Sequence, residues 1–220
     1  MKKTILVTLL GALFLSVAIA QTAPPFWNDI VAFKKLDSIQ PPVAHPILLI
    51  GSSSFTKWKD VNEYFPGYPI VNRGFGASTL LDQIRYAYDL ILPYQPKQVL
   101  IYCGENDLAY SDSLTAGEVV KRFKTLFGII RLNLPETIIN YVSIKPSPLR
   151  KNVRDKVIES NKQIKSFMKK QRNAGYIDVF YPMLDVNGKP RADLFIQDSL
   201  HMNPQGYVLW KQIILPYLVR

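Results

Sequence analysis

The feature that most constrains the fold of this chain is the regular alternation of short apolar runs with longer segments of helical period. Short continuous apolar runs bounded by glycine or proline are typical of strands that are buried on both faces of a sheet. We expect strands at residues 47–50, 70–72, 98–102, 138–144 and 176–180. Alternation with helices over short loops predicts that these strands run parallel.

Between the predicted strands, apolar residues recur at intervals of three and four, which indicates helices that bury one face. We expect helices at residues 26–33, 80–91, 115–134, 153–168 and 207–218. Thr115 and Glu118 have the spacing of a capping box at the start of the third helix. The sequence therefore predicts an α/β fold with a five-stranded parallel sheet between two helical layers, as one domain over residues 21–220.

Residues 1–20 differ in character from the rest of the chain. Lys2 and Lys3 precede an uncharged, largely apolar run that ends in the small residues of Ala18-Ile19-Ala20. This pattern predicts a secretory signal peptide that is cleaved before Gln21, and hence a secreted or periplasmic protein. The alternative is an uncleaved membrane anchor, because the run is at the lower limit of length for spanning a bilayer.

Composition narrows the kinds of site that the chain can build. Its 220 residues are 48% hydrophobic, which is enough to form a full core and excludes a disordered chain. The single cysteine, Cys103, excludes an intrachain disulfide and a thiolate metal cluster. Cys103 lies in an apolar run, so we expect it to be buried.

The net charge of +10 is concentrated in one part of the chain. Without Lys2 and Lys3, 25 cations face 17 acids, and residues 145–172 alone hold ten cations and two acids. The rest of the mature chain is therefore neutral overall. The basic segment is either a solvated helix face or a surface that contacts anionic lipid or acidic polysaccharide. A secreted destination excludes intracellular nucleic acid.

Polar residues follow four of the predicted strands. These segments are Gly51 to Ser54, Asn72 to Ser78, Gly104 to Asp107 and Asp198 to His201. The carboxyl ends of parallel strands share one rim, where ligands bind in such folds. A hydroxyl, a turn of small residues, an amide and an Asp/His pair are the groups that acyl transfer requires.

In this order, Gly-x-Ser, Asn-x-Gly, Gly-x-Asn-Asp and Asp-x-x-His resemble the four blocks of the SGNH (GDSL-type) hydrolases, a family of serine esterases and acylhydrolases. The resemblance extends from about Ile47 to about Leu218. It implies a flavodoxin-like three-layer α/β/α sandwich and ester hydrolysis through a serine acyl-enzyme. It also implies that neither a metal nor an organic cofactor takes part.

The resemblance assigns roles to single residues. Ser53 matches the nucleophile, although chemistry alone does not choose among Ser52, Ser53 and Ser54. His201 matches the base that takes the serine proton, and Asp198 matches the carboxylate that orients the imidazole.

The oxyanion hole is assigned in the same way. The donors are the side-chain amide of Asn106 and the backbone N–H groups of Ala77 and Ser53, with Gly76 and Asp107 in supporting roles. Ser52 replaces the aspartate that the family often has before the nucleophile. Ala77 replaces a usual glycine, so its N–H serves only if the backbone angles suit a residue with a Cβ.

Simpler interpretations of these residues are also open. His201 could be a surface or capping residue, and Asn106, Gly74 and Gly76 could serve a turn alone. A non-catalytic carbohydrate-binding protein would be expected to have lost the triad, and a nucleotide-binding protein requires a phosphate loop. The glycine that closes Gly-x-Ser-x-Gly is missing after Ser53, which argues against an α/β-hydrolase.

No lid is visible in the sequence, so we expect a short acyl ester, acetyl-like, of a carbohydrate or other small substrate. The alternative is a lysophospholipase or thioesterase type of acylhydrolase.

Overall fold

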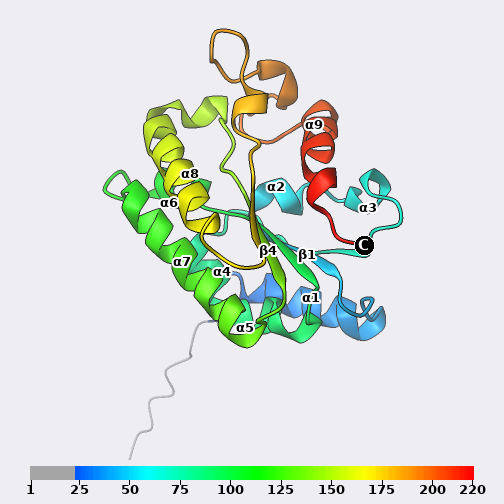
Figure 1. The fold of residues 1–220 in the computed structure, drawn as a ribbon. Helices are drawn as coiled ribbons and strands as arrows, with labels where there is room; N and C mark the ends of the chain where they lie inside the picture. Colours follow the sequence, from blue (N-terminus) through cyan, green and yellow to red (C-terminus); the bar gives the residue numbers. More distant parts are fainter. Residues whose placement is uncertain (1–22) are drawn as a thin grey trace, which may run out of the picture.

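A computed structural model describes residues 23–220 and contains one parallel sheet between layers of helices (Figure 1). The predicted signal peptide lies outside these residues. The five strands have the order β2-β1-β3-β4-β5, which is the flavodoxin-like arrangement. The strands are β1 (Ile47–Gly51), β2 (Ile70–Asn72), β3 (Gln98–Tyr102), β4 (Ile138–Val142) and β5 (Ala174–Ile177). The predicted α/β class and parallel sheet are confirmed.

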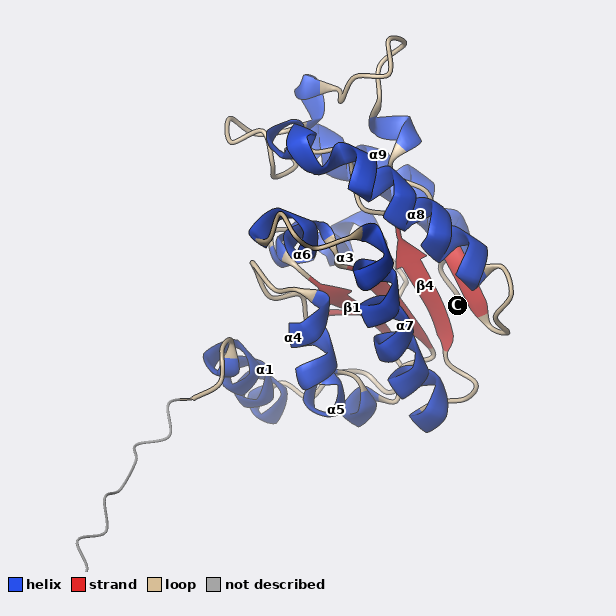
Figure 2. Cartoon of the chain, turned by 90° about the vertical axis from the view of Figure 1, so that its left-hand side faces the viewer, coloured by secondary structure: helices blue, strands red, loops and turns tan. Residues whose placement is uncertain are grey.

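Helices cover both faces of the sheet (Figure 2). One face is covered by α1 (Trp27–Ile39), α4 (Leu80–Arg85), α5 (Ala87–Leu90), α7 (Ala116–Asn133) and α8 (Arg154–Met168). The other face is covered by α2 (Ser53–Thr56), α3 (Val61–Tyr64) and α9 (Pro204–Ile214). The helix α6 (Glu105–Tyr110) follows β3 directly. Short 3-10 helices are η1 (Leu92–Tyr94), η2 (Pro148–Val153), η3 (Tyr181–Met183), η4 (Ala192–Leu194) and η5 (Leu215–Tyr217).

The strands supply two cores because successive side chains point to opposite faces of the sheet. In β3, Val99 and Ile101 pack under α7 and α8, whereas Leu100 and Tyr102 pack under α2 and α9. Cys103 is buried, as expected from its apolar run. Within residues 23–220, no helix is both long and apolar enough to cross a membrane.

The last two strands have bounds that differ from the prediction, because side chains form hydrogen bonds with the backbone groups near their ends. Strand β4 was expected to reach residue 144, but Asn161 of α8 binds both the N–H and the carbonyl of Ile144, each at 2.9 Å. Strand β5 was expected at 176–180, but it lies at 174–177. The N–H groups of Val179 and Phe180 donate to the Ser143 hydroxyl at 2.9 and 3.1 Å instead of to a strand.

The helices were predicted in the right places with some errors at their ends. The predicted helix 80–91 is broken at Tyr86, which leaves helical geometry and donates its hydroxyl to the Pro25 carbonyl. The last helix begins earlier than expected, because Asn203 caps it by accepting the Gly206 N–H at 3.0 Å. Thr115 caps α7 through the Glu118 N–H at 3.2 Å, the first half of the predicted box.

Candidate active site

The candidate site lies at the carboxyl ends of the strands, where the polar segments meet. Ser53 is the first residue of α2, directly after β1, and Asn106 is the second residue of α6, after β3. Gly51 has φ +133°, and a Cβ there would lie 1.9 Å from the Tyr102 carbonyl oxygen. Only glycine therefore lets β1 pass this close to β3 before the chain turns into Ser53.

Ser53, His201 and Asp198 form an unbroken chain of hydrogen bonds. The Ser53 Oγ lies 3.0 Å from His201 Nε2, and His201 Nδ1 lies 2.5 Å from Asp198 Oδ2. A carboxylate only accepts, so Nδ1 donates to it and neutral Nε2 accepts the serine proton. The arrangement can therefore deprotonate the hydroxyl of Ser53 as that hydroxyl attacks a carbonyl carbon.

The loop that carries Asp198 and His201 is held by Asp198 itself. Its Oδ1 accepts the backbone N–H groups of Leu200 and His201 at 2.9 and 2.8 Å. Ser199 has φ +56°, so the chain turns tightly enough for one carboxylate to reach both backbone and ring. The spacing of three residues between acid and base follows from this turn.

Hydrogen bonding keeps Asp198 ionised. Partial burial raises the pKa of this carboxyl, but hydrogen bonds from the backbone and ring of His201 and from Leu200 outweigh it. The net result lowers the pKa of Asp198 to about 2. The carboxylate therefore carries its negative charge beside the imidazole throughout the neutral range.

Two backbone donors at the rim have no acceptor among residues 23–220. These are the N–H groups of Ser53 and Ala77, and both are absent from the hydrogen bonds of the described chain. Ala77 has φ +63°, in the left-handed region that costs an alanine about 1–2 kcal/mol. The turn from Phe75 to Ser78 is held by the Ser78 hydroxyl, which donates to the Phe75 carbonyl at 2.8 Å.

The side-chain amide of Asn106 is buried beside this turn. Its Nδ2 donates to the Ser78 carbonyl at 3.0 Å and to the Ser52 hydroxyl at 3.3 Å. The second of these bonds is long, so the same N–H can also donate to a substrate oxygen as a three-centre bond. The contact with Ser52 was not expected from the sequence, because it joins residues 54 positions apart.

Asp107 serves the surrounding structure. Its two oxygens accept the Leu80 N–H at 3.0 Å and the Arg122 guanidinium at 2.8 Å, which joins α6 to the start of α4 and to α7. Burial raises the pKa of this carboxyl, against the opposing effect of those two partners. Asn72 also has a structural role: its Oδ1 accepts the Gly74 N–H at 3.0 Å within its own turn, and its amide donates to the Phe55 carbonyl of α2 at 2.7 Å.

A buried ion pair between Lys145 and Glu105, next to Asn106, was not predicted from the sequence. Lys145, with 1% of its side chain exposed, lies 2.6 Å from Glu105 Oε2. Glu105 also accepts the hydroxyls of Tyr102 and Ser147. The signal in the sequence was the lysine directly after an apolar strand. A lysine at a buried strand end must be paired, so its position indicates a nearby carboxylate.

Comparisons with known proteins agree with this fold. The family model described as GDSL-like Lipase/Acylhydrolase family matches residues 50–209. No curated protein matches the chain.

Solved structures share the fold at low sequence identity. A protein from Streptococcus pneumonia described as a platelet activating factor is 20% identical, with a TM-score of 0.76 over 87% of this chain and 92% of that one. A protein from Bacteroides fragilis described as an acylhydrolase is 15% identical, with a TM-score of 0.75 over 87% and 96%. A GDSL-like lipase from Bacteroides thetaiotaomicron is 17% identical, with a TM-score of 0.71 over 86% and 97%.

Proposed function

This chain belongs to the GDSL-like lipase/acylhydrolase family and is a serine ester hydrolase, and we propose that Ser53, His201 and Asp198 carry out its reaction. The observation that carries the assignment is the continuous hydrogen-bonded chain from Asp198 Oδ2 through both ring nitrogens to Ser53 Oγ. Ser52 and Ser54 flank Ser53, but of these three serines, all within the described part of the chain, only Ser53 bonds to the imidazole.

The proposed reaction has two steps. In the first, Ser53 Oγ attacks the ester carbonyl while His201 Nε2 takes its proton, and the imidazolium then protonates the departing alcohol. In the second, His201 takes a proton from water, the resulting hydroxide attacks the acyl-serine, and Ser53 leaves with the proton. The carboxylate of Asp198 stabilises the imidazolium in both steps.

The proposed oxyanion hole uses the N–H groups of Ser53 and Ala77 and the amide of Asn106. The two backbone groups are supporting observations because they have no other acceptor in residues 23–220. Asn106 contributes when the N–H that makes the long bond to Ser52 also donates to the substrate oxygen, while Ser52 holds the amide in place. Donors of this kind each contribute about 2.7–4 kcal/mol to the transition state.

We propose that the substrate is a short acyl ester, acetyl-like, of a carbohydrate or other small substrate. Two short connections support this proposal: α2 begins two residues after β1 ends, and α6 begins three residues after β3 ends. Neither connection is long enough to form an apolar tunnel over Ser53. A lysophospholipase or thioesterase activity is the alternative, and it would require room for a long acyl chain.

The test uses p-nitrophenyl acetate, butyrate and octanoate with the wild type, Ser53→Ala and His201→Ala. We expect both variants to lose at least about a thousandfold in kcat, and acetate to be the best substrate. Ser52→Ala and Ser54→Ala are the matched controls for the choice of nucleophile. A wild type no faster than Ser53→Ala on any ester, acetylated sugars included, would overturn the proposal. Preference for octanoate would favour the alternative.

We also propose that the protein is secreted or periplasmic and that residues 1–20 are removed before Gln21. The basic start, the apolar run and the small residues at 18 and 20 support this proposal. Expression of the full chain in a secreting bacterial host, followed by mass spectrometry of the product, tests it. Retention of Met1 in a membrane-bound product would show an uncleaved anchor instead.

A further inference from the structure

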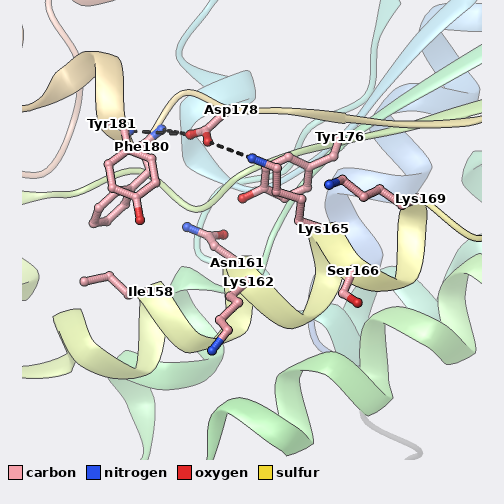
Figure 3. Close-up of a pocket in the computed structure, with 10 residues that line it drawn as sticks. All are labelled: Ile158, Asn161, Lys162, Lys165, Ser166, Lys169, Tyr176, Asp178, Phe180 and Tyr181. Carbon is pink, nitrogen blue, oxygen red and sulfur yellow. Dashed lines mark hydrogen bonds and ion pairs between the residues drawn. The ribbon is translucent and has the colours of Figure 1, made fainter.

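The most unusual surface outside the candidate active site is a basic groove along helix α8. Two cavities of about 350 and 270 Å³ lie between α8 with its preceding η2 and the chain from residue 176 to residue 190, and both are lined by Phe180. We call the two together the α8 groove. On the side of η2 and α8 it is lined by Arg150, Lys151, Arg154, Lys162, Lys165 and Lys169. Figure 3 shows the larger cavity.

The positive charge of the α8 groove is largely unmatched. Of these six cations, only Lys165 lies within 4 Å of a carboxylate in residues 23–220, namely Asp178 at 3.7 Å. Arg150 and Arg154 each have a buried Nε with no hydrogen-bond acceptor among the described residues. Both Nε atoms are buried, so a ligand with anionic oxygens would bind the outer guanidinium nitrogens, of which Arg154 Nη2 already donates to the Gly188 carbonyl at 2.6 Å.

The single acid in the larger cavity is engaged within the protein. Asp178 Oδ1 accepts the N–H groups of Phe180 and Tyr181 at 3.1 and 3.4 Å, which fixes the turn that follows β5. Its other oxygen faces Lys165 (Figure 3). The acids of helix α8, Asp155 and Glu159, do not line either cavity. The side chains that line each of the two cavities therefore carry a net positive charge.

Aromatic rings form the opposite wall of the groove. Tyr181 is 63% exposed and packs edge-on against Phe180 at 5.2 Å between ring centroids. Lys165 lies 5.5 Å from the centre of the Tyr176 ring. Flat rings offer an apolar face to the C–H face of a sugar, while the neighbouring cations offer charge to its acidic groups.

The shape of the groove indicates a linear ligand. Arg154 begins α8 and Lys169 directly follows its last residue, so the two are fifteen residues apart, or about 22 Å along the helix axis. A single small anion cannot contact both ends, whereas a chain with an acidic group on each sugar can. A planar bilayer cannot enter a recess of this kind, so the concave shape favours a polysaccharide over anionic lipid.

One end of the α8 groove lies beside the loop of the candidate active site. The N–H of Leu149, in η2, donates to the Ser199 carbonyl at 3.0 Å, and Ser199 lies between Asp198 and His201 in the sequence. A polymer in the groove would therefore run toward Ser53.

We propose that the α8 groove binds an acidic polysaccharide and presents an ester of that polymer to Ser53. The proposal deepens the proposed function and rests on it for the hydrolytic step, but polymer binding itself requires no catalysis.

The test measures binding to the Ser53→Ala protein, which keeps the groove and lacks the nucleophile. The probes are an oligomer of galacturonic acid, a neutral glucose oligomer of the same length, and vesicles of phosphatidylglycerol. The groove variant changes Lys162, Lys165 and Lys169 to Gln. The matched control changes Lys121, Lys124 and Lys170 to Gln, three exposed lysines that do not line the groove.

We expect the acidic oligomer to bind and the groove variant to weaken its Kd about tenfold, because three surface charge contacts are lost. The control variant, with the same change in net charge, should stay within about twofold. Equal weakening by both variants, or equal binding of the neutral oligomer, would overturn the proposal. So would binding to the vesicles without binding to the oligomer.

This result is independent of the esterase assay. If wild type and Ser53→Ala hydrolyse every ester equally slowly, the proposed function fails while a groove that binds the oligomer stands. If the esterase assay succeeds and the oligomer does not bind, only the groove proposal fails.

Discussion

The side-chain amide of Asn106 lies 3.3 Å from the hydroxyl of Ser52, the residue immediately before the candidate nucleophile. Ser52 is 4% exposed, so water does not replace it as a partner of the amide. The family often has aspartate at position 52. In this protein the serine at that position accepts a hydrogen bond from Asn106. We infer that Ser52 is a positioning residue, which acts on the oxyanion through Asn106.

Removing this hydroxyl should therefore affect the rate more than binding. We expect Ser52→Ala to lower kcat on p-nitrophenyl acetate about three- to tenfold with KM nearly unchanged, because one modest hydrogen bond orients the donor. Ser54→Ala removes a neighbouring hydroxyl that does not bond to Asn106, and it should leave kcat as it is. Equal effects of the two substitutions would contradict a positioning role for Ser52.

Asp198 should contribute to stability at neutral pH and lose that contribution in acid. Its pKa in the folded protein, about 2, lies below the usual value of 3.8, so the folded state binds fewer protons between these values. Stability from this group is therefore complete above about pH 4 and is lost as pH falls toward 2. The side chain is 41% exposed, so solvent screening keeps the effect below about 1 kcal/mol.

Thermal unfolding of wild type and Asp198→Asn at pH 6 and pH 3 checks this. The Tm should fall further for the wild type than for the variant when the pH is lowered from 6 to 3. Asp155→Asn, on an exposed part of α8, is the control and should follow the wild type. The prediction fails if Asp198→Asn shows the full wild-type loss.

Replacing Ala77 with glycine should stabilise the folded protein. Its φ of +63° costs an alanine about 1–2 kcal/mol, and glycine removes this cost. Glycine also has more conformational freedom in the unfolded chain, which offsets about 0.4–1 kcal/mol of the gain. We expect Ala77→Gly to raise the free energy of unfolding by up to about 1 kcal/mol. The N–H is kept, so kcat should change less than about twofold.

Urea unfolding and the acetate assay measure both effects. Ala32→Gly, at an exposed position inside α1, is the same chemical change in a helical backbone. It should destabilise by about 1 kcal/mol. If both substitutions destabilise equally, Ala77 is not strained.

The buried pair of Lys145 and Glu105 should be costly to break on one side. Lys145→Met leaves a buried carboxylate without its cation, and we expect a loss of about 3–5 kcal/mol in the free energy of unfolding. Lys145→Met with Glu105→Gln removes both charges and should recover more than half of that loss. Urea unfolding at pH 7 measures it. A loss below about 1 kcal/mol for the single variant would show that water reaches Glu105.

The strands were predicted well because they lie inside the protein. Strands β1 and β3 are buried along their whole length, so apolar residues fill nearly every position after Gln98 at the start of β3, and the run itself marks the strand. Strands β4 and β5 were misjudged at their ends because Asn161 and Ser143 compete for the backbone. A polar side chain brought in from another element leaves no periodic signal in the sequence.

The short helices at the rim were also missed. Helices α2 and α6 have four and six residues, too few to show a period of 3.6 or to be stable alone. They form because parallel strands end there and because packing on the sheet holds them. Ser53 and Asn106 lie at the starts of these two helices. The local sequence pattern therefore could not predict where their side chains point.

By itself, the sequence determined the order of strands and helices, the parallel sheet and the four polar segments at its rim. These features depend on which residues are apolar and which loop residues are polar, and both are visible in the local sequence. Only the tertiary structure decided which groups meet. Ser53 and His201 are 148 residues apart, and they touch because β1 and the loop after β5 both end at one edge of the sheet. The partner of Asn106, the angle of Ala77 and the pairing of Lys145 depend on contacts across that edge. No local pattern encodes a distance between segments that are remote in the chain.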